Sequence, residues 1–288
     1  MLMRLVLQSF LGLVLALSTA QAQEASLCSH SIMTPIERVG YSHPLFPIIE
    51  NIVRRRYNLT VLGTQDVASR GRRGILFVMN HPSFSDPVLT TIALQEFQPA
   101  PIMSMAVANQ PGLGPVIRYA TDKINTMYVP KGDTGIKREQ RKAMLEALLQ
   151  EIAERLERGE NVILWPAGEL MESDRSVLGN NRMLADIIEA APNARIVLGR
   201  TSGLWGSSFG GVAAHKLDMG RAALNAGIAI GSSFLPGETP RRDVGIELFE
   251  PNDLPRDGGR AAINEYVENW YNEIEQPLIR VPYSQFGR

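Results

Sequence analysis

The chain has 288 residues, of which 44% are hydrophobic and 20% charged, and its formal net charge at pH 7 is -1. This composition is typical of a globular protein with a sizeable core, and the near-neutral charge gives no signal for nucleic acid as a partner. One cysteine and four histidines without H-x-x-x-H or H-E-x-x-H spacing exclude an internal disulfide framework and argue against a cysteine- or histidine-based metal site, so no metal or cofactor is expected.

The first 22 residues have the three parts of a secretory signal. Arg4 precedes an apolar run over residues 5–17, and an A-x-A cleavage site ends at Ala22. The run is shorter than the roughly 20 residues of a spanning helix, which favours a cleaved signal over a permanent membrane anchor. An anchor, or a translation start at Met33, stays open as an alternative. We expect a membrane-associated protein, on a side of the membrane that these alternatives leave open, with one domain over residues 35–288.

Two arginine clusters follow, at residues 54–56 and 70–73, and only Asp66 opposes them. Residues 41–53, YSHPLFPIIENIV, place an apolar strip beside the first cluster. Basic and apolar side chains in this combination are typical of a domain that binds an anionic membrane surface. A core helix or strand next to a solvated basic face is the alternative interpretation.

From residue 35 onward, short apolar runs alternate with helical patterns, without a linker or a repeat. Strands are expected over residues 74–79, 101–107, 124–129, 161–165, 195–199, 228–234 and 244–249. Helices are expected over residues 87–95, 113–121, 135–159, 184–190, 213–226 and 260–274. Most strand runs are continuously apolar, which indicates strands covered on both faces. The sequence therefore predicts a single α/β domain with a central, mostly parallel or mixed sheet flanked by helices.

The expected strand over residues 74–79 runs directly into a polar cluster, NHPSFSDP. His81 and Asp86 lie on either side of a turn, and Pro87 can begin the next helix. Strand ends are where α/β sheets usually bind ligands. An imidazole, whose ordinary pKa is about 6.5, suits a general base at neutral pH, and a nearby carboxylate can hold its tautomer. The same residues taken alone also fit a turn with a helix cap.

The order Asn80, His81, Ser83, Asp86 resembles the first block, N-H-x-S-x-x-D, of the glycerolipid acyltransferases, the family of lysophosphatidic acid and lysophospholipid acyltransferases. The resemblance implies that His81 takes the proton from an acceptor hydroxyl, which then attacks the thioester of acyl-CoA or acyl carrier protein. It implies that Asp86 orients His81, and that Asn80 and Ser83 are polar groups of the substrate site.

The segment INTMYVPKGD resembles the second block of this family, and Lys131 stands where an arginine usually meets the acceptor phosphate. Lysine keeps the charge but loses the planar two-point grip of a guanidinium. The resemblance thus makes Lys131 a candidate substrate contact that holds a phosphate less specifically.

The segment LWPAGELMESDR resembles the third block, F-P-E-G-T-R, and Ala167 replaces its glutamate. Gly168, Glu169 and Arg175 are the candidate substrate contacts here, with Arg175 in the role of the missing arginine. Proline and glycine at this spacing suit a tight turn after a strand, which can present backbone N–H groups to an anion. The later segment GLWGS resembles a bacterial form of the fourth block, so the resemblance covers roughly residues 50–235.

The sequence therefore predicts an O-acyltransferase of phospholipid biosynthesis, which moves a fatty acyl group from acyl-CoA or acyl carrier protein to a lysophospholipid such as 1-acylglycerol-3-phosphate. Two alternatives stay open. One is a lipid hydrolase or thioesterase that uses Ser83, although Ser83 is not flanked by the glycines of a G-x-S-x-G elbow. The other is an exported lipid-surface binding protein that has lost turnover. A cleaved signal would also separate the domain from acyl donors, which are cytosolic.

Overall fold

The computed structural model describes residues 41, 44–109, 118–119, 121–130, 135–207 and 241–279. Its strands are β1 (Tyr57–Leu62), β2 (Ile75–Met79), β3 (Ala100–Ser104), β4 (Met127–Val129), β5 (Val162–Leu164), β6 (Arg195–Ser202) and β7 (Arg242–Phe249). Its helices are α2 (Leu45–Arg56), α3 (Thr64–Ser69), α4 (Asp86–Ala93), α5 (Met105–Ala108), α7 (Arg138–Glu157), α8 (Met183–Ala190) and α11 (Gly259–Asn272). The expected signal or anchor, the strand over residues 228–234, the helix over residues 213–226 and Lys131 lie outside the described residues.

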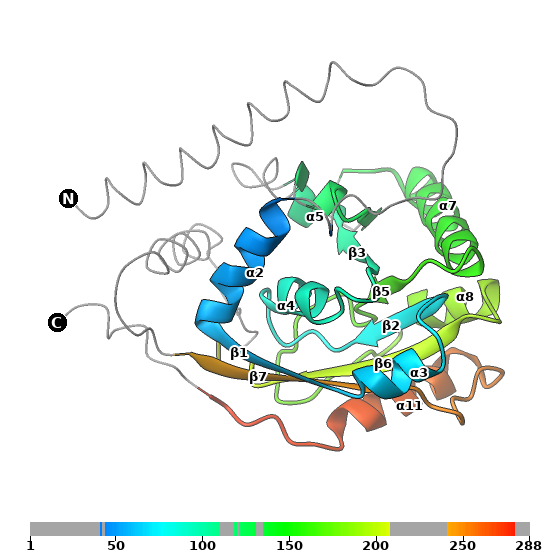
Figure 1. Cartoon of the computed structure of the whole chain (residues 1–288). Coiled ribbons are helices and arrows are strands. Elements are labelled where there is room, and N and C mark those ends of the chain that lie inside the picture. Colours follow the sequence, from blue (N-terminus) through cyan, green and yellow to red (C-terminus); the bar gives the residue numbers. More distant parts are fainter. Residues whose placement is uncertain are drawn as a thin grey trace, which may run out of the picture.

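The strands form one seven-stranded sheet in the order β1-β7-β6-β2-β5-β3-β4 (Figure 1). Every neighbouring pair is parallel except β6 and β7, which are antiparallel. The prediction of a single α/β domain with a mixed sheet is therefore confirmed. Because β2 lies between β5 and β6, the loops that follow these three strands meet at one edge, which we call the carboxyl edge. The amino ends of β7 and β1 lie at the same edge.

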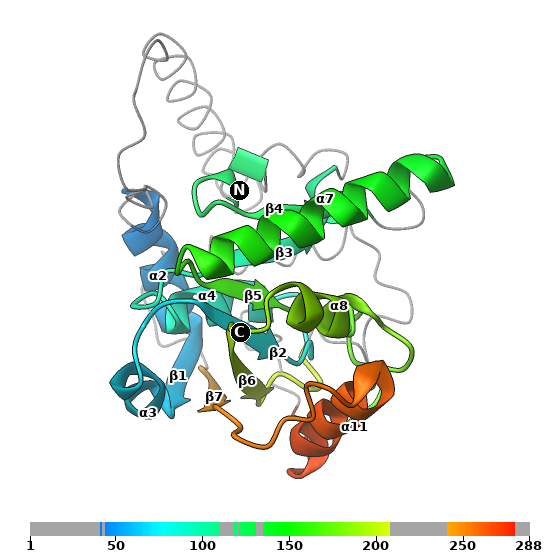
Figure 2. The same ribbon diagram turned by 90° about the vertical axis from the view of Figure 1, so that its right-hand side faces the viewer.

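The core explains why β2 reads as a continuous apolar run. All five of its side chains are fully buried. Leu76 and Val78 pack with α7, α8 and α11 on one face of the sheet. Ile75, Phe77 and Met79 pack on the other face, with side chains of α3 and of the segment that follows α4. Figure 2 shows α8 and α11 on one side and α3 and α4 on the other. A strand covered on both faces has no polar positions, so its pattern does not alternate.

The sequence pattern misses the elements before β2 and extends β3 too far. The strand β1 alternates between half-buried and exposed positions because it is the outermost strand of the sheet and pairs only with β7. The expectation that residues 105–107 continue β3 is wrong. The chain turns into α5 there, because the Ser104 hydroxyl accepts a hydrogen bond from the Ala106 N–H at 3.3 Å and caps the helix.

The two arginine clusters lie at opposite ends of the strands, one at the carboxyl edge and one at the other end. Residues 54–56 end α2 at the carboxyl edge, whereas residues 70–73 precede β2 at the other edge. In the second cluster, Arg72 pairs with Glu96 at 2.9 Å and Arg73 donates to the carbonyl of Arg158 at 3.2 Å. The clusters therefore do not form one continuous basic surface, and only the first lies beside the loops after β2, β5 and β6.

Gly203, directly after β6, is expected to tolerate no side chain. Its φ is +84°, and an added Cβ would lie 2.2 Å from the carbonyl oxygen of Asp243. Gly203→Ala should therefore lower the free energy of unfolding by about 2–4 kcal/mol, which urea denaturation measures. Gly135→Ala is the matched control, since Gly135 has a φ of +68° but a Cβ added there would meet no atom of the described residues within 4 Å. It should cost about 1 kcal/mol, and equal losses in the two variants would contradict the steric explanation.

Candidate active site

Asn80 extends the hydrogen bonding of the sheet beyond the end of β2. Its backbone N–H donates to the Gly199 carbonyl at 3.2 Å. Its side-chain amide donates to the carbonyl of Thr201 at 3.1 Å and accepts from the Thr201 N–H at 2.7 Å. The side chain is buried, so these hydrogen bonds fix Asn80, and with it the next residue, His81, against β6. A direct contact between Asn80 and substrate stays a prediction.

His81 and Asp86 are in direct contact at the carboxyl edge. The His81 Nδ1 lies 3.0 Å and 2.9 Å from the two carboxylate oxygens of Asp86. Asp86 opens α4, with Pro87 directly after it, and is completely buried, whereas the His81 side chain is 16% exposed. An ionised carboxylate can only accept a hydrogen bond, so opposite it a neutral ring carries its proton on Nδ1 and its lone pair on Nε2. Such a nitrogen can take a proton from a substrate.

Burial raises the pKa of the Asp86 carboxyl above its ordinary range, and the nearby His81 and the Ser83 N–H act in the opposite direction. The desolvation of the carboxylate is thus the dominant effect, since a charge is disfavoured where water is absent. The same desolvation strengthens the attraction between Asp86 and a protonated His81. The pair is therefore suited to stabilise the imidazolium that forms when His81 acts as a base.

Ser83 connects the first block to the turn after β6. Its backbone N–H donates to Asp86 Oδ2 at 3.3 Å. Its hydroxyl lies 2.9 Å from the Ser85 hydroxyl and 3.1 Å from that of Ser207. Ser83 is fully buried, and its hydroxyl is held by other serines. Sequence reasoning did not select Ser207, although the GLWGS segment that it ends was the signal that pointed there.

The third block lies against His81. A turn follows β5, in which the Gly168 N–H donates to the Trp165 carbonyl at 3.0 Å and Gly168 has a φ of +66°, a conformation that favours glycine. The Trp165 and His81 ring centroids are 5.9 Å apart. The Met171 N–H donates to the carbonyl of His81 at 2.9 Å. The tertiary structure thus brings together blocks that are more than 80 residues apart in sequence.

The other predicted substrate contacts are less closely placed. Gly168, Glu169 and Arg175 are exposed on the loop that includes Met171, and their contacts with substrate stay predictions. Lys131 lies outside the described residues. The strand before it, β4, is three strands from β2, which is roughly 14 Å at the usual spacing. Arg200, in β6, is buried against the Trp270 ring and pairs with Glu247 at 2.6 Å, so its guanidinium already has a carboxylate partner within the protein.

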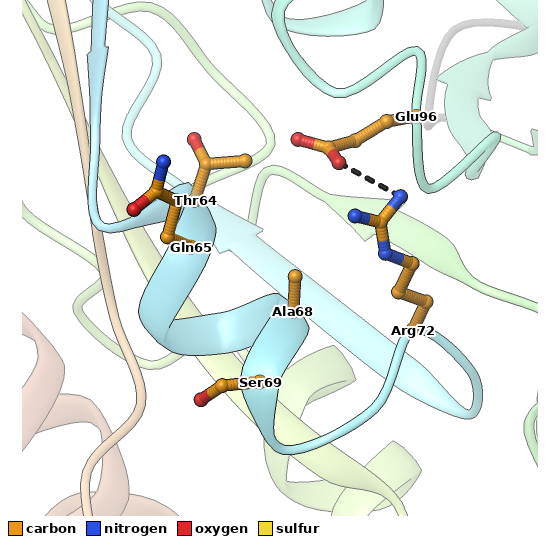
Figure 3. Close-up of a pocket in the computed structure, with 6 residues that line it drawn as sticks. All are labelled: Thr64, Gln65, Ala68, Ser69, Arg72 and Glu96. Atoms are coloured by element: carbon orange, nitrogen blue, oxygen red, sulfur yellow. Dashed lines mark ion pairs between the residues drawn. The ribbon is translucent and has the colours of Figure 1, made fainter.

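A surface pocket of about 310 Å³ lies away from these residues, at the opposite edge of the sheet (Figure 3). It is lined by Thr64, Gln65, Ala68, Ser69, Arg72 and Glu96. These belong to α3, to the segment before β2 and to the segment before β3, and none is a candidate site residue. The pocket contains no histidine, and its two charged groups pair with each other. The lining of this pocket therefore offers no base of the kind that the carboxyl edge offers.

The comparison with protein families decides the class of the protein. The model of the Acyltransferase family matches residues 58–233, more than half of the chain. The chain belongs to the Acyltransferase family. The protein is thus an acyltransferase, which confirms the class of enzyme that the N-H-x-S-x-x-D block implies. The matched region contains every candidate site residue.

A solved structure with a similar arrangement is the 1-acyl-sn-glycerophosphate (LPA) acyltransferase PlsC from Thermotoga maritima, with 14% sequence identity and a TM-score of 0.48. The similarity covers 83% of this chain and 81% of that chain. Among curated proteins, none matches this chain significantly. Within the part of the chain that the structure describes, no helix has both the length and the apolar character needed to cross a membrane.

Proposed function

We propose that this acyltransferase moves a fatty acyl group from acyl-CoA or acyl carrier protein to the free hydroxyl of a lysophospholipid. The His81–Asp86 pair carries the proposal, because it offers a base whose Nδ1 is held at 2.9 Å by a buried carboxylate at the carboxyl edge. The reaction needs such a base, since an alcohol is a weak nucleophile until its proton is removed.

The proposed reaction proceeds in two steps. His81 Nε2 takes the proton of the acceptor hydroxyl while the hydroxyl oxygen bonds to the thioester carbonyl carbon, which gives a tetrahedral intermediate. The intermediate then collapses, the carbon–sulfur bond breaks, and the imidazolium returns the proton to the leaving thiolate. Asp86 stabilises the imidazolium between the two steps. The product is an ester, and no acyl-enzyme forms.

The contacts of Ser83 favour acyl transfer over a serine hydrolase. A nucleophilic serine would need its hydroxyl within hydrogen-bond reach of the base. The Ser83 hydroxyl is instead within hydrogen-bonding distance of Ser85 and Ser207, and His81 directs Nδ1 at Asp86. Ser83 is therefore proposed to shape the loop and not to react.

We also propose that the carboxyl edge faces an anionic membrane surface. Beside His81, Phe84 and Val88 are 40% and 45% exposed, and Phe84 lies 6.4 Å from the imidazole between ring centroids. The neighbouring helix α2 (Figure 1) exposes Ile48 and Ile49, and in its last turn Arg54 and Arg55 are exposed whereas Arg56 is buried. Exposed apolar groups next to cations suit a lipid–water interface, where the acyl chain of a lysophospholipid resides.

The test is to incubate the purified protein with labelled acyl-CoA, or labelled acyl carrier protein, and a panel of lysophospholipids with different head groups. We expect labelled diacyl phospholipid from at least one acceptor. Release of the fatty acid to water without transfer would favour the hydrolase. Binding to anionic vesicles with neither activity would favour a binding protein that has lost turnover.

The donor is tested separately by cell fractionation and N-terminal sequencing of a C-terminally tagged protein. A membrane-bound or cytosolic domain is expected if acyl-CoA or acyl carrier protein is the donor. A mature exported protein that begins near Gln23 would contradict these cytosolic donors and point to another acyl source, such as a phospholipid.

A further inference from the structure

The loop that carries the third block is long and has no regular secondary structure. It runs from Trp165, after β5, to Arg182, before α8. Backbone N–H and C=O groups in such a loop need partners outside a helix or sheet. Its second half obtains them from one helix, α11, which lies outside the residues matched by the family model.

Three polar side chains of α11 bind this half of the loop. Asn264, Glu268 and Asn272 are spaced four residues apart, so they lie along one face of the helix, and we call them the α11 stripe. They make six hydrogen bonds to loop backbone groups. Asn264 donates to the carbonyls of residues 179 and 181 at 3.0 and 2.9 Å, and Glu268 accepts from the N–H groups of residues 178 and 179 at 2.5 and 2.8 Å. Asn272 accepts from the N–H of residue 176 at 2.8 Å and donates to its carbonyl at 2.9 Å.

A chain of contacts joins the stripe to the catalytic histidine. Asn272 holds both backbone groups of Ser176. The Ser176 hydroxyl donates to the Met171 sulfur at 3.3 Å, and the Met171 N–H donates to the His81 carbonyl at 2.9 Å. Met171 and Ser176 are buried, so this chain passes through the interior of the protein. The loop residues between them include the exposed segment 172–175.

We propose that the α11 stripe positions the third-block loop for catalysis, so that Met171 supports the His81 backbone and Glu169 and Arg175 are presented to the acceptor. Asn264, Glu268 and Asn272 are thus positioning residues that act through the loop. The part that concerns the acceptor rests on the proposed lysophospholipid acyltransferase function. The part that concerns the loop and His81 does not.

The test compares Glu268→Ala, Glu268→Gln and Tyr266→Phe in the full-length protein. Glu268→Ala removes the acceptor for two N–H groups, whereas Glu268→Gln keeps an acceptor oxygen at the same place. Tyr266→Phe is the matched control, because its hydroxyl bonds to Asp253, outside the loop, from the same helix. Asn272→Ala is the second variant, in case Glu268→Ala does not fold.

Glu268→Ala and Asn272→Ala should raise the KM for the acceptor by about tenfold with the KM for the acyl donor nearly unchanged, because a displaced loop loses acceptor contacts. In Glu268→Gln, the KM for the acceptor should return most of the way to the wild-type value, and Tyr266→Phe should behave as wild type. An unchanged acceptor KM in both alanine variants, or a Glu268→Gln variant as impaired as Glu268→Ala, would overturn the proposal.

Amide hydrogen exchange separates this inference from the proposed function. Peptides that cover residues 171–181 should exchange at least about tenfold faster in the alanine variants, while peptides from β2 stay protected. If the wild type transfers acyl groups to no lysophospholipid, the proposed function fails. The exchange rate of the Met171 amide still tests whether the α11 stripe positions the loop. Unchanged exchange at that amide would overturn it.

Discussion

His81→Ala is expected to lower kcat/KM for acyl transfer by a factor on the order of 10³, within the 10²–10⁴ range of general base catalysis. The variant loses the only described imidazole at the carboxyl edge, so the acceptor hydroxyl keeps its proton when it meets the thioester. Single-turnover transfer from labelled acyl-CoA measures the loss. Substrate binding should change little, because the removed group acts mainly in the transition state.

The control for His81→Ala is Gln65→Ala, in the pocket at the opposite edge of the sheet (Figure 3). Gln65 is exposed, so the variant should fold and transfer acyl groups at the wild-type rate. Loss of activity in Gln65→Ala together with normal transfer by His81→Ala would show that the reaction takes place in that pocket. Equal activity of His81→Ala and wild type would remove His81 from the mechanism.

Asp86→Asn is expected to lower the rate of acyl transfer and to raise the thermal stability at pH 8. An amide can donate to His81 Nδ1 and so favour the tautomer that has its proton on Nε2, where the base must be free. The corresponding change in the serine protease triad lowers kcat about 10⁴-fold, and a loss on the order of 10³ to 10⁴ is expected here. The variant also removes a completely buried carboxylate. At pH 8, its thermal midpoint should therefore be higher than that of the wild type.

The pH dependence of this difference follows from the direction of the Asp86 pKa. Burial raises the pKa of the carboxyl in the folded protein above its value in the unfolded chain. The stability that the protonated carboxyl contributes is full below the unfolded pKa and is lost as pH rises through the folded pKa. Thermal unfolding scans between pH 4 and pH 8 should show the advantage of Asp86→Asn growing with pH. A variant less stable than wild type at pH 8 would show that the contact with His81 outweighs the burial.

Much of the fold follows from local patterns. The continuous apolar runs of β2, β5 and β6 predict strands covered on both faces, and the spacing of apolar residues predicts α7, whose Leu148, Ile152 and Leu156 are buried. The sequence pattern did not predict β1, because an edge strand keeps exposed positions that can be polar. Its alternation is therefore a weak signal, and the arginine clusters before and after it obscure that signal further. Short elements such as α3 have too few residues for a periodic signal.

For the candidate site, the sequence by itself determined the residue types, their order and the strand end on which they stand. The contact between His81 and Asp86 is local, since the two residues are five positions apart across one turn, and so it could be expected from spacing. Three other contacts could not be expected from spacing. They are the ion pair of Arg200, the contact between Ser83 and Ser207, and the hydrogen bonds from α11 to the third-block loop. They join residues that are 47 to 124 positions apart. Only the tertiary structure decides such contacts, because no local pattern encodes which strands are neighbours or which helix packs beside a loop.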